Sequence, residues 1–237
     1  MDIAWADYKG IALSFISKTG IVSPAYCEPA GNGFLRSFHA GLLTTCGLTS
    51  MGAACEDEGK ALGLHGRASN IPAEDVCVSN EWDADDFIMK IRGRVRESVV
   101  FGENITLTRE IKANLGENKL TISDIVENCG FERQPLMLLY HFNFGYPLLD
   151  SRTKLILPEG TVKARDEAAE KGIGSFDEFS EPIHGYAEQV FYHDLITKDD
   201  GKVTTILFNE DLCISGLGAY IKYNKKQLPY FKSSSEM

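Results

Sequence analysis

The chain has 237 residues and a formal net charge of −10, from 24 lysines and arginines against 34 aspartates and glutamates. Hydrophobic residues make up 43 % and charged residues 24 %, ordinary values for a globular protein that argue against disorder. No apolar run approaches the roughly 20 residues of a membrane-spanning helix, and the first residues lack the pattern of a secretory signal. The negative charge, with no basic stripe to offset it, argues against a nucleic-acid partner. A neutral or weakly polar small molecule suits this chain better.

The cysteines are scattered along the chain, with no Cys-x-x-Cys pair and no clustered spacing. They are Cys27, Cys46, Cys55, Cys77, Cys129 and Cys213. This pattern, with no secretory signal, favours reduced thiols in a soluble cytoplasmic protein over a disulfide framework. We expect no metal site.

The first eighty residues are expected to be mostly loops, because eight glycines fall between residues 31 and 66. Strand patterns dominate from residue 87 onward. Two short β-rich runs, residues 87–91 and 94–101, lie on either side of Gly93. Long loops on a β scaffold often carry function, which makes the N-terminal third a candidate ligand-binding region.

A hairpin is predicted where residues 104–113 and 119–128 alternate between apolar and polar side chains on either side of a turn-rich segment. Residues 162–172 form the only convincing helical stretch, and because it lacks a wide apolar face we expect a short surface helix or turn there. A second meander is expected from residues 188–195, 202–209 and 212–223. With no repeat or linker, these patterns predict one all-β domain, residues 1–237, built from two packed sheets.

Two segments place polar side chains in apolar surroundings. In Leu62-Gly63-Leu64-His65-Gly66-Arg67, a histidine and an arginine flank a glycine that lets a ligand approach the backbone. Residues 138–149 are predicted as a strand in which His141 and Asn143 share a polar face, while Tyr140 and Phe142 share an aromatic one. The pattern alone leaves structural and ligand-binding readings of His65 and His141 both open. The other histidines look less functional: His39 is expected to be structural, and His184 and His193 solvated near strand ends.

A family resemblance joins these segments. Its motifs are Phe38-His39-Ala40-Gly41-Leu42-Leu43-Thr44-Thr45-Cys46-Gly47-Leu48, Leu64-His65-Gly66-Arg67, Phe101-Gly102-Glu103-Asn104 and Tyr140-His141-Phe142-Asn143-Phe144-Gly145-Tyr146-Pro147-Leu148-Leu149. Together they resemble a bacterial aldose 1-epimerase-related family of largely unknown function, within the galactose mutarotase-like superfamily that includes deoxyribose mutarotase-like proteins. The resemblance implies an all-β galactose mutarotase-like supersandwich. We expect this chain to lack part of that fold at both ends.

The resemblance implies roles for individual residues. His141 matches the histidine that acts as the acid, and His65 matches a substrate-binding histidine, although Arg67 replaces the second glycine of the family's His-Gly-Gly motif. Gly185-Tyr186-Ala187-Glu188 is similar to a segment that binds a sugar hydroxyl through a carboxylate, shifted by one residue to Glu188. Arg36 is the loosest match, to a substrate-binding arginine, and Asn143 joins the set through the face it shares with His141.

The resemblance also implies a glutamate base in a Gly-Leu-Glu-Pro-like segment, which this sequence does not contain. Three readings therefore stay open. The chain is an aldose 1-epimerase acting on a small aldose by acid–base ring opening, a carbohydrate-binding protein without turnover, or an inactive fragment that lacks the glutamate base. None of these needs a cofactor or a metal. The expected partners are a small sugar and, if strand edges are unpaired, further copies of the chain.

Overall fold

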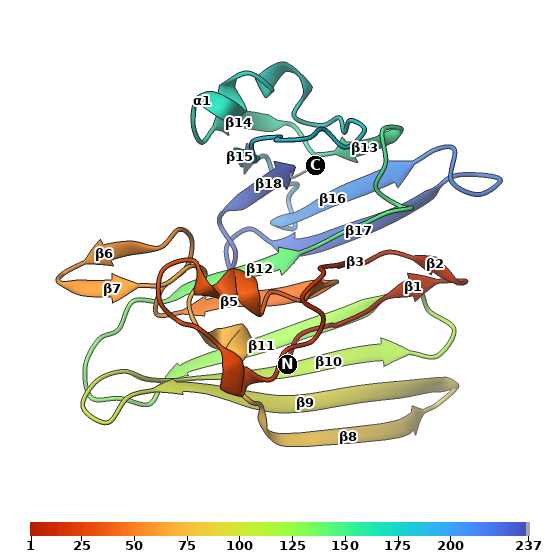
Figure 1. Ribbon diagram of the computed structural model, residues 1–237. Helices are drawn as coiled ribbons and strands as arrows, with labels where there is room; N and C mark the ends of the chain where they lie inside the picture. The colour runs from red at the N-terminus through yellow and green to blue at the C-terminus, as the bar shows by residue number, and fades with distance from the viewer. Residues whose placement is uncertain (236–237) are drawn as a thin grey trace. The chain divides into compact units, whose positions relative to one another are not determined.

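The computed structural model describes residues 1–235 and is almost entirely β, as the sequence predicts (Figure 1). The last two residues of the predicted 1–237 domain lie outside the described residues. The chain divides into two compact units. Unit 1 comprises Met1–Ala6 and Ser14–Asn143, and unit 2 comprises Asp7–Leu13 and Phe144–Met237.

Unit 1 contains a four-stranded antiparallel sheet of order β11-β10-β9-β8. Its strands are β8 (Glu74–Asp83), β9 (Asp86–Ser98), β10 (Asn104–Asn114) and β11 (Leu120–Asn128). The predicted hairpin is the β10–β11 pair, with Leu107 opposite Val126. The sequence predicted two runs around Gly93, but β9 is one continuous strand, because Gly93 pairs with Arg109 of β10 in an unbroken register. A Cβ at Gly93 would lie 2.7 Å from the Met1 Sδ.

A second, two-stranded sheet pairs β5 (Leu43–Leu48) with β12 (Met137–Phe142). Its inner face packs on the larger sheet through Leu48, Ala68, Ile105 and Leu107, with Val126 and Leu138 beside them. Burying each such aliphatic side chain contributes about 1.5–3 kcal/mol. Unit 1 is therefore a small sandwich of two packed sheets.

Short elements complete unit 1. They are β3 (Phe15–Ile16), β4 (Ala40–Gly41), β6 (Cys55–Asp57), β7 (Lys60–Leu62) and the 3₁₀ turns η1 (Pro24–Tyr26), η2 (Gly33–Arg36) and η3 (Ala68–Asn70). The N-terminal third is largely loop, as expected, apart from short strands, the start of β8 and β5, which is buried along its whole length. Within the described residues β8 lies at the edge of its sheet and exposes Val78 and Trp82. Self-association through such an edge stays a prediction.

Unit 2 contains two three-stranded antiparallel sheets, of order β13-β16-β17 and β14-β15-β18, and the small hairpin β1-β2. The bounds are β1 (Asp7–Tyr8), β2 (Ile11–Ala12), β13 (Thr153–Ile156), β14 (Gly160–Ala164), β15 (Gln189–Leu195), β16 (Lys202–Asn209), β17 (Leu217–Asn224) and β18 (Phe231–Ser235). The predicted meander is wrong in its first step. Strand β16 does pair with β17, but β15 pairs with β14 and β18. The Ile196 amide, just after β15, donates to the Glu159 carbonyl and keeps this part of the chain on the β14-β15-β18 sheet.

The predicted short helix or turn over residues 162–172 is wrong in its first three residues. Residues 160–164 form strand β14, because Val162 pairs opposite His193 and the sheet satisfies its backbone groups. Only α1 (Glu167–Glu170) is α-helical, capped by the Asp166 carboxylate, which accepts from the Ala169 amide at 3.0 Å. A 3₁₀ turn, η4 (Ile173–Ser175), follows.

Candidate functional site in unit 1

Two histidines far apart in the sequence meet in unit 1. The ring centroids of His65 and His141 lie 5.5 Å apart, with an interplanar angle of 74°. His141 comes from β12, and His65 from the loop between β7 and η3. Both side chains are half-buried. Edge-to-face contact at this distance places two ionisable rings beside each other.

Strand alternation explains the orientation of His141. His141 pairs opposite Thr44, and its neighbour Tyr140 pairs opposite Thr45. Successive side chains of a strand point to opposite faces, so Leu138 and Tyr140 face the core of unit 1 while His141 faces away from it. The strand ends at Phe142, shorter than the predicted 138–149 segment.

The backbone holds His65 from several directions. His65 adopts a left-handed φ of 60°, and its amide donates to Gly52 at 2.8 Å. The Gly47 amide donates to the His65 carbonyl, and the Arg67 amide donates to the Gly47 carbonyl. The next residue must be glycine, because a Cβ on Gly66 would lie 2.3 Å from the Ser50 carbonyl oxygen. The loop is therefore fastened to the end of β5.

Two phenylalanines close a ring of four aromatic contacts around the histidines. Phe34 lies 5.3 Å from His65 at 76°, and Phe38 lies 5.6 Å from His141 at 71°. The two phenylalanines lie 5.3 Å from each other. Each imidazole therefore has one phenylalanine and the other imidazole as ring neighbours.

A buried polar network lies on the core side of β12. Arg109 is 1 % exposed and forms two hydrogen bonds with the Asp124 carboxylate, at 2.8 and 2.6 Å. It also donates to the Thr45 hydroxyl at 2.7 Å, and the Tyr140 hydroxyl donates to Asp124 at 2.7 Å. The face of β12 that was predicted to be aromatic therefore also carries a buried ion-pair network, to which the Tyr140 hydroxyl belongs.

This network shifts the pKa of two of its members. Burial, reinforced by the hydrogen bond to Asp124, raises the pKa of the Tyr140 hydroxyl. For Arg109, burial acts to lower the pKa, but the hydrogen bond and charge of Asp124 outweigh it, and the pKa lies above its usual value. Both side chains thus keep their protons at neutral pH and hold β5 and β12 on the larger sheet.

The other predicted site residues of unit 1 have different surroundings. Asn143 is buried, and its side-chain amide donates to the His141 carbonyl at 3.0 Å. Arg67 is exposed and follows His65 directly. Arg36 is exposed and paired with Glu28 at 3.3 Å. The structure thus brings His65 and His141 together, ties Asn143 to the backbone beside them and directs Arg36 toward Glu28.

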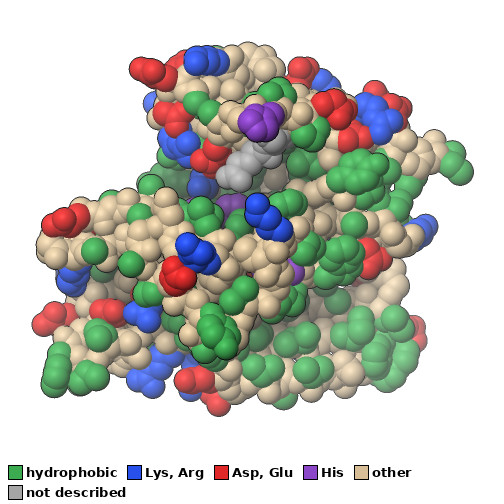
Figure 2. Space-filling model, viewed as in Figure 1, with side chains coloured by type: hydrophobic (Ala, Val, Ile, Leu, Met, Phe, Trp, Pro, Cys, Tyr) green, Lys and Arg blue, Asp and Glu red, His purple; other side chains and the backbone are tan. Residues whose placement is uncertain are grey.

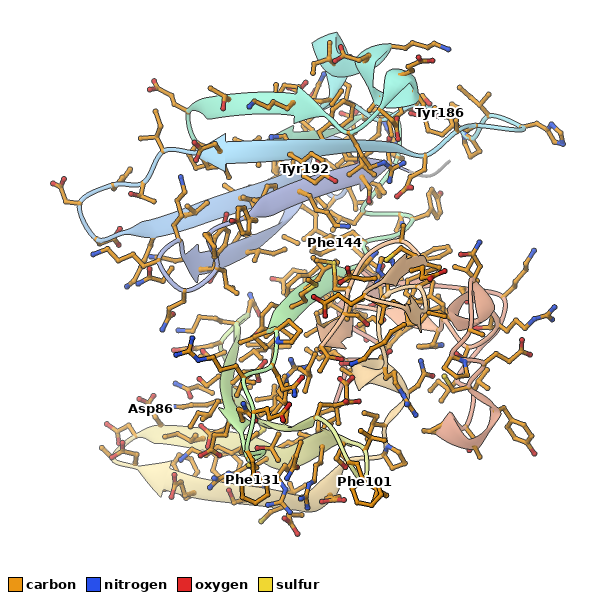
Figure 3. All side chains as sticks on the ribbon, turned by 90° about the vertical axis from the view of Figure 1, so that its left-hand side faces the viewer. Asp86, Phe101, Phe131, Phe144, Tyr186 and Tyr192 are labelled. Atoms are coloured by element: carbon orange, nitrogen blue, oxygen red, sulfur yellow. The ribbon has the colours of Figure 1, made fainter. Side chains whose placement is uncertain are left out.

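Glu188, the remaining predicted site residue, belongs to unit 2. Its carboxylate accepts from Arg165 at 2.9 Å, and both side chains are partly exposed. The flanking residues Tyr186 and Gln189 line a cavity of about 280 Å³ in this unit, together with Phe176 and Ser235. The Tyr186 hydroxyl lies 3.2 Å from that of Ser235. Figure 3 labels Tyr186 at one end of this unit.

One prediction for the remaining histidines is wrong. His193 is only 7 % exposed, with its Nε2 atom 2.9 Å from the Ser233 hydroxyl and its ring against Phe176 and Phe231. Its pKa is lowered to about 4 by burial. It was expected at the surface because it lies near a strand end, but β14 and β18 flank it on both sides. His184 is exposed, as expected.

Sequence reasoning missed Phe34, Phe38, Arg109 and Asp124. Phe38 stands inside a motif of the resemblance, and this was the only available signal for the aromatic contacts. Arg109 and Asp124 occupy the apolar-facing positions of two strands predicted to pair. A charge of each sign on the buried face of one hairpin would have indicated an internal ion pair.

The surface charge, candidate metal ligands and helix lengths do not point to a further site. In Figure 2 acidic and basic side chains are interspersed over the visible face. Among residues 1–235, no cluster of three or more histidines, cysteines, aspartates or glutamates could hold a metal ion. In the same part of the chain, no helix is long and apolar enough to cross a membrane.

Comparison with known proteins assigns the family. A family model described as "Domain of unknown function (DUF4432)" matches residues 1–234, and the chain belongs to that family. This agrees with the resemblance to an aldose 1-epimerase-related family of largely unknown function. No curated protein matches the chain.

One solved structure shares the fold. It is the crystal structure of a putative aldose 1-epimerase from Klebsiella pneumoniae subsp. pneumoniae MGH 78578, with a TM-score of 0.87 and 24 % sequence identity. The match covers 94 % of this chain and 58 % of that protein, so the chain spans little more than half the length of its structural relative. The chain therefore has an aldose 1-epimerase-like β fold.

Proposed function

We propose that the protein is an aldose 1-epimerase-like enzyme that interconverts the anomers of a small aldose. The observation that carries this proposal is the contact between His65 and His141, whose ring centroids lie 5.5 Å apart. Anomer exchange needs proton donors and acceptors around one sugar ring, and imidazole changes charge near neutral pH. The aldose 1-epimerase-like fold supports the same reaction class, although a fold alone hosts several chemistries.

His141 is the proposed acid. It donates a proton to the ring oxygen as the bond between that oxygen and the anomeric carbon breaks. The anomeric hydroxyl gives its proton to solvent water and becomes the carbonyl of the open-chain aldehyde. Rotation about the adjacent carbon–carbon bond and reclosure give the other anomer. A positioned proton donor contributes about 10²–10⁴-fold to such a step, and no cofactor takes part.

His65 is proposed to bind a sugar hydroxyl beside His141. Arg67 is proposed to contact the substrate because it directly follows His65, and Asn143 because it follows His141 by two residues. Arg36 is assigned a substrate contact on the resemblance alone. Asn143 also supports the His141 backbone through its 3.0 Å hydrogen bond. Glu188 is assigned a hydroxyl contact on the resemblance alone, and no residue is named as the base. The proposal places the protein in the cytoplasm, in keeping with cysteines that form no disulfide within residues 1–235.

The test is anomer exchange in the 237-residue chain, measured by NMR on a panel of aldoses. We expect His141→Ala to lower the exchange rate by about 10²–10⁴-fold and His65→Ala mainly to raise KM. His184→Ala is the matched control, because this histidine is exposed and has no proposed role.

Two outcomes would contradict the proposal. Sugar binding without exchange in the unsubstituted chain would identify a carbohydrate-binding protein without turnover. Exchange that His141→Ala leaves at full rate would remove the acid assignment.

A further inference from the structure

Phe34 and Phe38 come from one short segment and reach both histidines. Phe34 belongs to the 3₁₀ turn η2, and Phe38 follows two residues after its end. Phe34 is 4 % exposed, and the Ser37 amide donates to the Phe34 carbonyl at 3.0 Å, which ties the end of the turn together. The two rings therefore belong to one locally bonded unit.

Each ring contacts a different histidine at a similar geometry. The Phe34–His65 and Phe38–His141 centroid distances are 5.3 and 5.6 Å, with interplanar angles of 76° and 71°. Edge-to-face contacts of this kind have a directional preference, since the positive edge of one ring meets the negative face of the other. Each phenylalanine thus restricts the rotation of the imidazole that it touches.

The same segment is anchored beyond the rings. The Ser17 hydroxyl donates to the Phe38 carbonyl at 2.5 Å, and the Ser17 amide donates to the His39 carbonyl at 3.0 Å. The Nε2 atom of His39 lies 3.1 Å from the Ala4 carbonyl oxygen. These bonds fix the segment on the chain around β3 and on the N-terminal residues, so the phenylalanines form a fixed wall rather than a loose loop.

We infer that Phe38 is a positioning residue for His141, and that Phe34 is the equivalent positioning residue for His65. Neither ring transfers a proton. Each holds its imidazole in one rotamer, and the Phe34–Phe38 contact couples the two orientations. The kinetic part of this inference rests on the proposed function, whereas the part concerning ring orientation does not.

The test compares Phe38→Leu, Phe38→Tyr and Phe34→Leu in the 237-residue chain. Two-dimensional ¹H–¹⁵N spectra of the histidine rings report the tautomer and the titration midpoint of each imidazole. Phe38→Leu is expected to move the His141 signals and midpoint more than those of His65, and Phe34→Leu to do the reverse. Phe38→Tyr retains the ring and is expected to restore the His141 signals.

Activity gives the second measurement. A lost aromatic contact predicts a fall in kcat for anomer exchange of about two- to twelvefold in Phe38→Leu, with a smaller change in KM. If Phe38→Leu does not fold, Phe38→Met fills the space with a flexible side chain that has no ring face. Folded Leu or Met variants whose His141 signals equal those of the unsubstituted chain would overturn the inference.

The two hypotheses fail separately. Absence of exchange in the unsubstituted chain would refute the proposed function, while the histidine spectra would still decide the roles of Phe34 and Phe38. Full exchange together with unchanged histidine spectra in both leucine variants would keep the function and refute the positioning roles.

Discussion

Tyr140 and His141 are adjacent in sequence, and their side chains serve opposite faces of β12. The Tyr140 hydroxyl donates to the buried Asp124 carboxylate at 2.7 Å, whereas the His141 ring lies against His65 and Phe38. One strand thus joins a buried ion-pair network to the candidate site. Any shift of β12 along β5 by one residue would exchange the two faces, so the network also sets the direction of the His141 side chain.

Arg109→Met should destabilise the protein strongly. The substitution leaves Asp124 buried without its guanidinium partner, and breaking such a pair costs about 3–5 kcal/mol of unfolding free energy. The measurement is denaturant unfolding followed by circular dichroism. Arg94→Met is the control, because Arg94 pairs with Glu74 and Asp75 at the surface and such pairs contribute about 0–1 kcal/mol.

The double variant Arg109→Met with Asp124→Leu gives the complementary measurement. It removes both charges at once, so a large part of the lost stability should return. An Arg109→Met variant as stable as Arg94→Met would show that the network contributes little.

Gly66→Ala should destabilise unit 1 and displace His65. A Cβ at Gly66 would lie 2.3 Å from Ser50 O and 2.5 Å from Gly47 O, on a backbone with a φ of +71°. Gly59→Ala is the matched control, since Gly59 has a φ of +74° but nothing within 4 Å of the added carbon. Both variants carry the cost of a left-handed alanine, about 1–2 kcal/mol.

Only Gly66→Ala adds the steric clash, so the difference between the two variants isolates it. We expect Gly66→Ala to have the lower midpoint of denaturant unfolding and, if the proposed function holds, the slower anomer exchange. Equal midpoints would mean that the His65 loop relaxes at little cost.

His193 should make the protein sensitive to acid. Burial lowers its pKa to about 4 in the folded chain, below the usual value of 6.5. Above pH 6.5 the ring is neutral in both states and has no effect. Between pH 6.5 and 4 the unfolded chain binds a proton that the folded chain does not, so the unfolding free energy falls as the pH falls.

The full loss, reached below about pH 4, is about 3 kcal/mol. His193→Gln keeps a hydrogen-bonding side chain for Ser233 but does not titrate there. Its unfolding free energy should therefore decline less between pH 7 and pH 5 than that of the unsubstituted chain, measured by urea unfolding at both values. Parallel declines would contradict the assignment to His193.

The sequence by itself determined the fold class, the β10–β11 hairpin and the residues worth examining. Alternation of apolar and polar side chains is a local property, and it identified these strands and the two faces of β12 without any tertiary information. The motifs around His65 and His141 further indicated the aldose 1-epimerase-related family. In contrast, the prediction of a helix or turn was wrong over residues 162–164, because pairing of β14 with β15 overrode a weak local preference.

Only the tertiary structure decided which of these residues meet. His65 and His141 are 76 positions apart, and their contact depends on the fastening of the Gly66 loop to β5 and on the pairing of β12 with the same strand. The burial of Arg109, the roles of Phe34 and Phe38 and the burial of His193 likewise arise from packing between distant segments. Local periodicity specifies the face of a strand on which a side chain lies, whereas the neighbours on that face depend on how the sheets pack.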